Sequence, residues 1–126
     1  MISMVRPSCP ALVIHNDDAF RKRLIAALDE NNFTVTYDTD GDGVLAVLGS
    51  RTFNVVLLGV NLETTVGTRA LEYLRARKTH VKCGVIILGD PDPRIRTYAP
   101  WADETLLKPV DPQYVASRAR SYCDCA

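Results

Sequence analysis

Residues 53–58 read FNVVLL, an almost continuous apolar run that ends at Gly59. A run that is apolar on both faces is typical of a central strand in a parallel sheet, because helices cover both sides of such a sheet. Gly67 follows Gly59 by eight residues and precedes a helical pattern. This stretch therefore predicts a buried strand, a loop and a helix, which is one βα unit of a parallel sheet.

Strand and helix patterns alternate five times along the chain. The strands are expected at 11–14, 33–37, 53–58, 83–88 and 105–108, and the helices at 17–30, 44–48, 65–78, 94–98 and 112–122. Pro91 and Pro93 shorten the fourth helix, whereas Asp111 and Pro112 supply an N-cap and a first-turn proline for the last one. Five such units predict an α/β fold, a three-layer sandwich with a five-stranded parallel sheet in the flavodoxin-like order 2-1-3-4-5. In such a sheet a ligand site lies beyond the carboxyl ends of the strands.

The size and charge of the chain limit its function. Its 126 residues fit a single domain with a core at about 11–122. Lys plus Arg and Asp plus Glu number 15 each, so no uniform field would attract nucleic acid or an anionic membrane. No apolar run approaches the roughly 20 residues of a membrane span, and 1–10 lack a signal-peptide pattern. We therefore expect a cytoplasmic protein that binds neither nucleic acid directly nor a membrane.

The four cysteines have no zinc-ligand spacing; they are Cys9, Cys83, Cys123 and Cys125. Cys83 opens an apolar strand and is expected to be a small core residue. Cys123 and Cys125 follow the last helix, where an exposed thiol could oxidise or bind a metal adventitiously. Because disulfides are rare in cytosolic proteins, we favour unlinked cysteines over a redox or metal role.

From about residue 11 to residue 122 the chain resembles the CheY-like receiver domain of bacterial response regulators. Residues 101–110, WADETLLKPV, are similar to the receiver's fifth strand, which ends in Lys-Pro. The strand, loop, glycine and helix of 54–74 are the second point of resemblance. The resemblance implies a domain of two-component signal transduction, and a cis bond between Lys108 and Pro109.

The resemblance also implies a phosphorylation pocket, from which this chain departs. In the family, an aspartate at the end of the third strand accepts a phosphoryl group, and two acids after the first strand help it to bind Mg²⁺. A Ser or Thr after the fourth strand would hold the phosphoryl group. The matching positions in this chain are Gly59, His15, Asn16 and Gly89, so that only Lys108 remains of the five. We therefore expect weak or absent Mg²⁺ binding and no cofactor.

Other positions of the resemblance are less specific. Asp17 matches an extra acid of the family and is the first candidate to satisfy the Lys108 ammonium. Asn61 would offer a metal no more than its backbone carbonyl. Thr105 occupies the position of an aromatic residue that switches in many receivers. Tyr98 and Trp101 are expected either at a partner surface or in core packing.

These observations predict a degenerate receiver, or pseudo-receiver, that signals through protein contacts without phosphorylation. The resemblance places its partner surface on the fourth helix, fifth strand and fifth helix, for another protein or for a homodimer. The alternative is a small-molecule or anion sensor that uses the vacated pocket between Gly59, Gly89 and Lys108. No enzyme activity is expected, because the strand ends offer no nucleophile–base pair and no Gly-rich phosphate loop.

Overall fold

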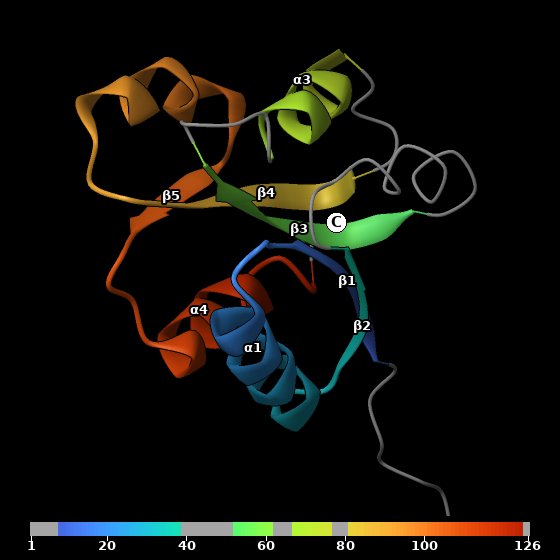
Figure 1. Cartoon of the computed structure of the whole chain (residues 1–126). Coiled ribbons are helices and arrows are strands. Elements are labelled where there is room, and N and C mark those ends of the chain that lie inside the picture. Colours follow the sequence, from blue (N-terminus) through green and yellow to red (C-terminus); the bar gives the residue numbers. More distant parts are fainter. Residues whose placement is uncertain (1–7, 39–51, 62–66, 77–80, 125–126) are drawn as a thin grey trace, which may run out of the picture.

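A five-stranded parallel sheet forms the centre of the computed structural model, which describes residues 8–38, 52–61, 67–76 and 81–124 (Figure 1). The strands are β1 (Cys9–Ile14), β2 (Phe33–Asp38), β3 (Phe53–Val60), β4 (Val81–Gly89) and β5 (Glu104–Leu107). Their order is β2-β1-β3-β4-β5, and every neighbouring pair is parallel. The predicted fold class and strand order are confirmed.

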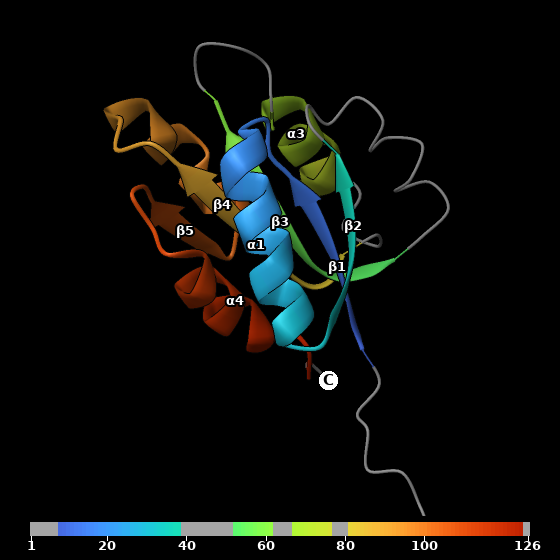
Figure 2. The same cartoon turned by 60° about the horizontal axis from the view of Figure 1, so that its bottom comes forward.

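Helices cover both faces of this sheet. They are α1 (Asp18–Glu30), α3 (Thr68–Ala76), α4 (Pro112–Arg120) and two short 3-10 helices, η2 (Pro93–Thr97) and η3 (Ala99–Trp101). Figures 1 and 2 show α1 and α4 on one face and α3 on the other, which gives the expected three layers. The helix expected at 44–48 lies outside the described residues. None of the helices in the described ranges has the length and apolar content that crossing a bilayer requires.

Short polar residues begin the helices where the sequence indicates. The carboxylate of Asp17 accepts a hydrogen bond from the Phe20 amide at 3.1 Å, and that of Asp111 accepts one from the Gln113 amide at 2.9 Å. Each bond satisfies an amide that has no partner within its own helix. The predicted starts of α1 and α4 are therefore correct.

The fourth helix and the flanking strands differ from the prediction. One helix was expected at 94–98, but the chain forms η2 and η3 instead, with Pro93 and Pro100 among their residues. Proline lacks the amide hydrogen that a longer α-helix would need there. β4 extends beyond the predicted 83–88, so Gly89 belongs to the strand, whereas Lys108 follows β5. The Lys108–Pro109 bond is cis, as the resemblance implies.

Two hydrophobic clusters, one on each face, fix the sheet between its helices. On the α1 and α4 side, Val13 and Leu57 are fully buried, whereas on the α3 side Leu12 and Leu58 are fully buried. Successive residues alternate between the two clusters because side chains of a strand point to opposite faces. Each fully buried leucine contributes about 1.5–3 kcal/mol of hydrophobic stabilisation.

A disulfide bond joins Cys9, which opens β1, to Cys123, which follows α4. The expectation of unlinked cysteines is therefore wrong for this pair. The two residues are 114 positions apart in the sequence, yet their Cα atoms lie 5.6 Å apart. No short spacing marks such a pair, because the fold alone brings the start of β1 to the end of α4. The side chains of Cys83 and Cys125 lie outside the described residues.

Candidate functional site

The carboxyl ends of the strands bring the sequence-predicted residues of the pocket to one edge of the sheet. His15 follows β1, Gly59 lies one residue before the end of β3, and Gly89 ends β4. Gly89 pairs with Val60 of β3 and with Leu107 of β5. Lys108 comes next, and its amide donates to the carbonyl of Gly89 at 2.8 Å. The register thus places the positions that the resemblance assigns next to one another.

The imidazole of His15 fills the space beside Gly59. A Cβ atom added to Gly59 would lie 2.5 Å from His15 Cδ2 and 2.8 Å from Cγ, far inside van der Waals contact. His15 is only 1% exposed. These ring atoms lie close to the His15 backbone, so they cannot move aside as the end of a long side chain could. Gly59 therefore leaves no open space at the end of β3.

His15 is held as a neutral imidazole. Its Nδ1 accepts a hydrogen bond from the Asp17 amide at 3.1 Å, so the ring proton belongs on Nε2. Nε2 is buried and has no hydrogen-bond partner among the described residues. Burial, followed by the positive charge of Lys108, lowers the pKa of His15 to about 4, although the carboxylate of Asp17 acts in the opposite direction.

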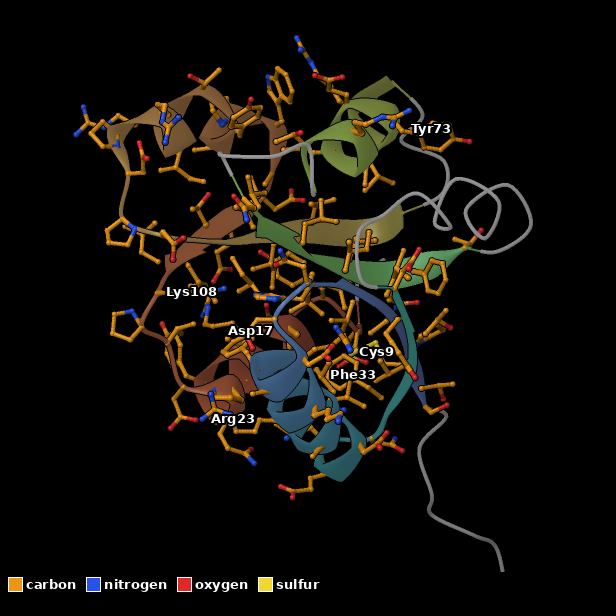
Figure 3. The ribbon with its side chains drawn as sticks, in the orientation of Figure 1. Cys9, Asp17, Arg23, Phe33, Tyr73 and Lys108 are labelled. Carbon is orange, nitrogen blue, oxygen red and sulfur yellow. A yellow bond between two sulfur atoms is a disulfide. The ribbon has the colours of Figure 1, made fainter. Side chains whose placement is uncertain are left out.

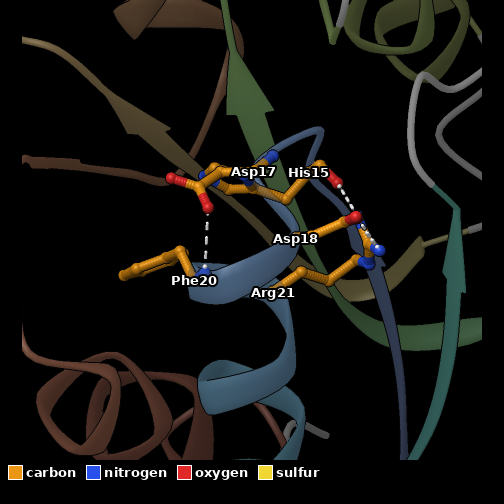
Figure 4. Close-up of polar contacts among 5 residues, drawn as sticks. All are labelled: His15, Asp17, Asp18, Phe20 and Arg21. Carbon is orange, nitrogen blue, oxygen red and sulfur yellow. Dashed lines mark hydrogen bonds and ion pairs between the residues drawn. The ribbon is translucent and has the colours of Figure 1, made fainter.

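Arg21 fixes the loop that carries His15 (Figure 4). The guanidinium is buried and donates through Nη1 to the carbonyl of His15 at 2.8 Å, while Nη2 pairs with the carboxylate of Asp18. It also lies 5.6 Å from the centre of the Tyr37 ring. The sequence reasoning missed this residue. The i, i+3 spacing of Asp18 and Arg21 at the start of a helix was the available signal.

The expected ion pair between the ammonium of Lys108 and Asp17 does not form (Figure 3). Its Nζ lies 5.2 Å from the centre of the Phe20 ring, and no ion pair of Lys108 occurs among the described residues. The carboxylate of Asp17 instead caps α1, and this bond to the Phe20 amide lowers the pKa of Asp17. Burial lowers the pKa of Lys108, whereas the carboxylates of Asp90 and Asp17 act in the opposite direction.

Ile95 occupies the space beside Gly89. A Cβ atom added to Gly89 would lie 2.8 Å from Ile95 Cδ1, and Ile95 is 7% exposed. The apolar contact stands where the resemblance implies a hydroxyl. At both glycines of the alternative hypothesis, a neighbouring side chain therefore occupies the Cβ position.

Gly67, which directly precedes α3, lies against the backbone of Gly59. Its φ of +82° lies in the left-handed region that glycine adopts readily. A Cβ atom at this position would also collide with the carbonyl oxygen of Gly59. Both constraints require a glycine here, so the backbone around Gly59 is tightly specified.

The side chains at this edge do not fit a hard divalent cation. His15 uses its Nδ1 lone pair for the Asp17 amide, and Asp17 uses one carboxylate oxygen for the helix cap. Asn16 is exposed and Asn61 is half-buried. Within the described ranges, no three His, Cys, Asp or Glu side chains form a group that could hold a metal ion. Mg²⁺ prefers an octahedral oxygen site with carboxylates, which these residues do not form.

The aromatic residues before β5 are packed more closely than the sequence suggests. Tyr98 and Trp101 are half-buried against the cluster on the α3 side, with their rings 5.4 Å apart and perpendicular. The guanidinium of Arg75 lies 4.3 Å above the Trp101 ring. Thr105 is half-buried in β5. Contacts within the protein therefore cover much of the surface of Tyr98 and Trp101, and neither ring is fully exposed.

Two other apolar residues are more exposed on the neighbouring elements. Leu107 at the end of β5 is 47% exposed, and Tyr114 in the first turn of α4 is 53% exposed. Sequence reasoning passed over both, since an apolar residue at a strand end or in a helix is usually buried.

Comparison with known proteins agrees with this architecture. The family model of the response regulator receiver domain matches residues 11–120. The transcriptional activator protein PfeR of Pseudomonas aeruginosa is 32% identical over 103 residues, which are 82% of this chain and 34% of PfeR. The transcriptional regulatory protein QseB of Haemophilus influenzae is 28% identical over 111 residues, which are 87% of this chain and 50% of QseB. The chain thus spans a third to a half of the length of these curated relatives.

Solved structures show the same fold at low sequence identity. The chemotaxis response regulator CheY4 of Vibrio cholerae superposes with a TM-score of 0.78 at 18% identity, over 91% of this chain and 98% of CheY4.

Proposed function

The chain belongs to the response regulator receiver family, a non-enzymatic signalling family of two-component signal transduction, and we propose that it is a pseudo-receiver within that family. Such a domain signals through protein contacts and does not pass through an aspartyl phosphate. In line with its length, we propose that it forms one receiver-like domain.

The observation that carries the proposal is the contact between His15 and Gly59. By the resemblance, the family's phosphoacceptor position holds a glycine here, and the buried imidazole of His15 occupies the space that the Cβ atom of an aspartate would need. Phosphoryl transfer requires an attacking oxygen in line with the leaving group, so a residue elsewhere on the rim is poorly placed to substitute. The neutral ring also supplies no negative charge for a metal ion.

The other side chains of the edge support the same conclusion. A Ser or Thr at position 89 would bring its Cβ atom against Ile95 Cδ1. Lys108 lies over the Phe20 ring, which is a structural role for the ammonium. Because His15 and Ile95 occupy the space at both glycines, no observation favours the small-molecule sensor as a second function.

Phosphorylation chemistry tests the proposal directly. The protein is incubated with acetyl phosphate and Mg²⁺, or with beryllofluoride and Mg²⁺, and is examined by intact mass and by ¹H–¹⁵N spectra. We expect no adduct and no shift centred on Lys108. A receiver that carries the complete set of acids, treated in parallel, shows that the reagents are active. A stoichiometric adduct on the wild-type chain would overturn the proposal, and Asp17→Asn and Asp90→Asn variants would then locate it.

For the partner surface, we propose the face formed by η2, η3, β5 and α4, with a second protein or a second copy of this chain as the partner. Its exposed apolar side chains, Leu107 and Tyr114, are the best candidates for a buried contact. We include Tyr98, Trp101 and Thr105 as half-buried members of this face.

Light scattering on concentrated protein distinguishes the two kinds of partner. If a dimer forms through this face, Leu107→Glu and Tyr114→Glu convert it to a monomer. Tyr37→Glu leaves it intact, because Tyr37 is 58% exposed on β2 at the opposite edge of the sheet. A monomer at all concentrations excludes a second copy as the partner and leaves another protein as the proposed one. A dimer that only Tyr37→Glu disrupts contradicts the assignment of the face.

A further inference from the structure

The amino ends of the strands, opposite the edge that holds His15, carry the Cys9–Cys123 disulfide. A cavity of about 570 Å³ opens beside this bond, and both cysteines line it. The remaining lining residues are Ser8, Pro10, Asn54, Arg120 and Asp124. Cys9 is buried at 5% exposure, whereas Cys123 is half-buried. Cys123 is therefore the more exposed residue of the two.

The residues that we call the C-terminal clamp, Tyr122 and Cys123, tie the end of α4 to the sheet. The side-chain amide of Asn54 in β3 donates to the carbonyl of Cys123 at 3.0 Å and to that of Tyr122 at 3.5 Å. The ring of Tyr122 lies directly against Gly84 of β4, where a Cβ atom would collide with it. The clamp therefore contacts β3 and β4, and the disulfide adds β1.

The phenol of Tyr122 extends the clamp to β5. Its hydroxyl donates to the carboxylate of Glu104 at 2.9 Å, and the same carboxylate accepts two hydrogen bonds from the guanidinium of Arg118 in α4. The position of Cys123 is thus connected, through Tyr122 and Glu104, to the packing of α4 against β5.

We propose that the Cys9–Cys123 bond is a reversible thiol–disulfide exchange site for a low-molecular-weight dithiol, and that its reduction releases the C-terminal clamp. The site lies at the other end of the sheet from Gly59, so the proposal is independent of whether the chain is phosphorylated. The cavity gives a small thiol a route to Cys123, and the polar residues that line the cavity suit a hydrophilic dithiol.

The exchange follows ordinary disulfide chemistry. A thiolate of the dithiol attacks Sγ of Cys123, the bond to Cys9 breaks, and Cys9 leaves as a thiolate that takes up a proton. The second thiolate of the dithiol then attacks the dithiol's first sulfur, which is bonded to Sγ of Cys123. Cys123 leaves as a thiolate and takes up a proton. Two electrons pass to the protein, and the dithiol becomes a cyclic disulfide.

Reduction removes a cross-link between residues 114 positions apart, so the unfolded chain gains conformational freedom. We expect the midpoint of thermal unfolding to fall by roughly 10 °C when the native protein is treated with dithiothreitol. Oxidised glutathione should restore the original midpoint. Peptide mapping without reductant should yield one fragment pair, linked through Cys9 and Cys123.

The side-chain amide of Asn54 provides a local measurement. Its ¹H–¹⁵N resonances, assigned through Asn54→Ser, should shift on reduction, because the carbonyl groups of Tyr122 and Cys123, to which this amide donates, belong to the clamp. Cys9→Ser should begin at the lower unfolding midpoint and should not respond to dithiothreitol. Cys83→Ser and Cys125→Ser should keep the wild-type response.

Three results would overturn the proposal. One is a protein in which peptide mapping finds Cys9 and Cys123 unlinked after treatment with oxidised glutathione. The second is a bond that dithiothreitol cannot reduce without unfolding the chain. The third is reduction that leaves both the midpoint and the Asn54 resonances unchanged. Because reduced wild-type protein is measured directly, the test does not depend on the folding of any variant.

Discussion

The contact between His15 and Gly59 predicts a strong energetic coupling between the two positions. Gly59→Ala adds the one atom that would stand 2.5 Å from the His15 ring, and the neighbouring residues Leu58 and Val60 are buried. Overpacking of this kind costs about 1–3 kcal/mol of unfolding free energy. When His15→Ala has removed the ring, the same change should be neutral or stabilising by about 0.4–1 kcal/mol, since alanine restricts the unfolded chain more than glycine does.

A double-mutant cycle measures this coupling. Wild type, Gly59→Ala, His15→Ala and the double variant are unfolded in urea and followed by circular dichroism. A loss of about 2 kcal/mol corresponds to a midpoint lower by about 1 M urea for a domain of this size. The coupling energy, which is the difference between the effects of Gly59→Ala with and without the ring, should lie at about 1–4 kcal/mol.

Gly89→Ala is the matched control for the steric argument. The atom that it would meet, Ile95 Cδ1, is the flexible end of a side chain and can turn away, so we expect a loss below about 1 kcal/mol. If Gly59→Ala cost the same with and without the His15 ring, the reasoning about the filled space would be refuted.

Three further predictions follow from the same contacts. His15 has a folded pKa of about 4, below its unfolded value of 6.5, so the unfolded chain takes up a proton first as the pH falls. The titration of His15 should therefore leave stability unchanged above pH 6.5, and the free energy of unfolding should fall by about 3 kcal/mol between pH 6.5 and 4. Urea midpoints measured across this range should show the loss in wild type and not in His15→Asn. Arg21→Met removes a buried donor from the His15 carbonyl and the partner of Asp18, and should cost about 1.5–3 kcal/mol in urea unfolding, whereas exposed Arg23→Met should cost little. Tyr122→Phe removes the hydrogen bond to Glu104 and should cost about 1 kcal/mol, with the larger part of the loss absent when Glu104 is already Ala, which has no acceptor. Equal losses in both backgrounds would contradict this contact.

The fold could be predicted from local patterns because they agree with the global arrangement. The apolar run at 53–58 has the composition of a central strand, and Asp17 and Asp111 mark the helix starts that the structure contains. Prolines made the region of η2 and η3 recognisable as irregular, but they could not specify two separate turns. The ends of β4 and β5 were predicted less accurately, since a strand ends where its pairing with the neighbouring strand ends. That point depends on the register between the two strands.

The members of the candidate site could be predicted, but their contacts could not. Spacing placed His15, Gly59, Gly89 and Lys108 at the same edge, because all four stand at strand ends. Sequence could not show that the His15 ring turns toward Gly59, or that Ile95 covers Gly89. The two glycines therefore suggested an empty pocket, whereas the side chains of His15 and Ile95 fill the space beside them. The disulfide was missed for a related reason, since closeness in space at a separation of 114 residues leaves no local pattern.

The imidazole beside Gly59 also constrains which substitutions the fold accepts at this position. A single replacement of Gly59 by aspartate would introduce its first carbon into the ring of His15, and selection would meet a loss of stability before any gain of chemistry. A smaller residue at position 15 must therefore appear first, although alone it opens a cavity and brings no new activity. Positions 15 and 59 therefore accept change only as a pair, because each single replacement destabilises the fold before the other can compensate for it.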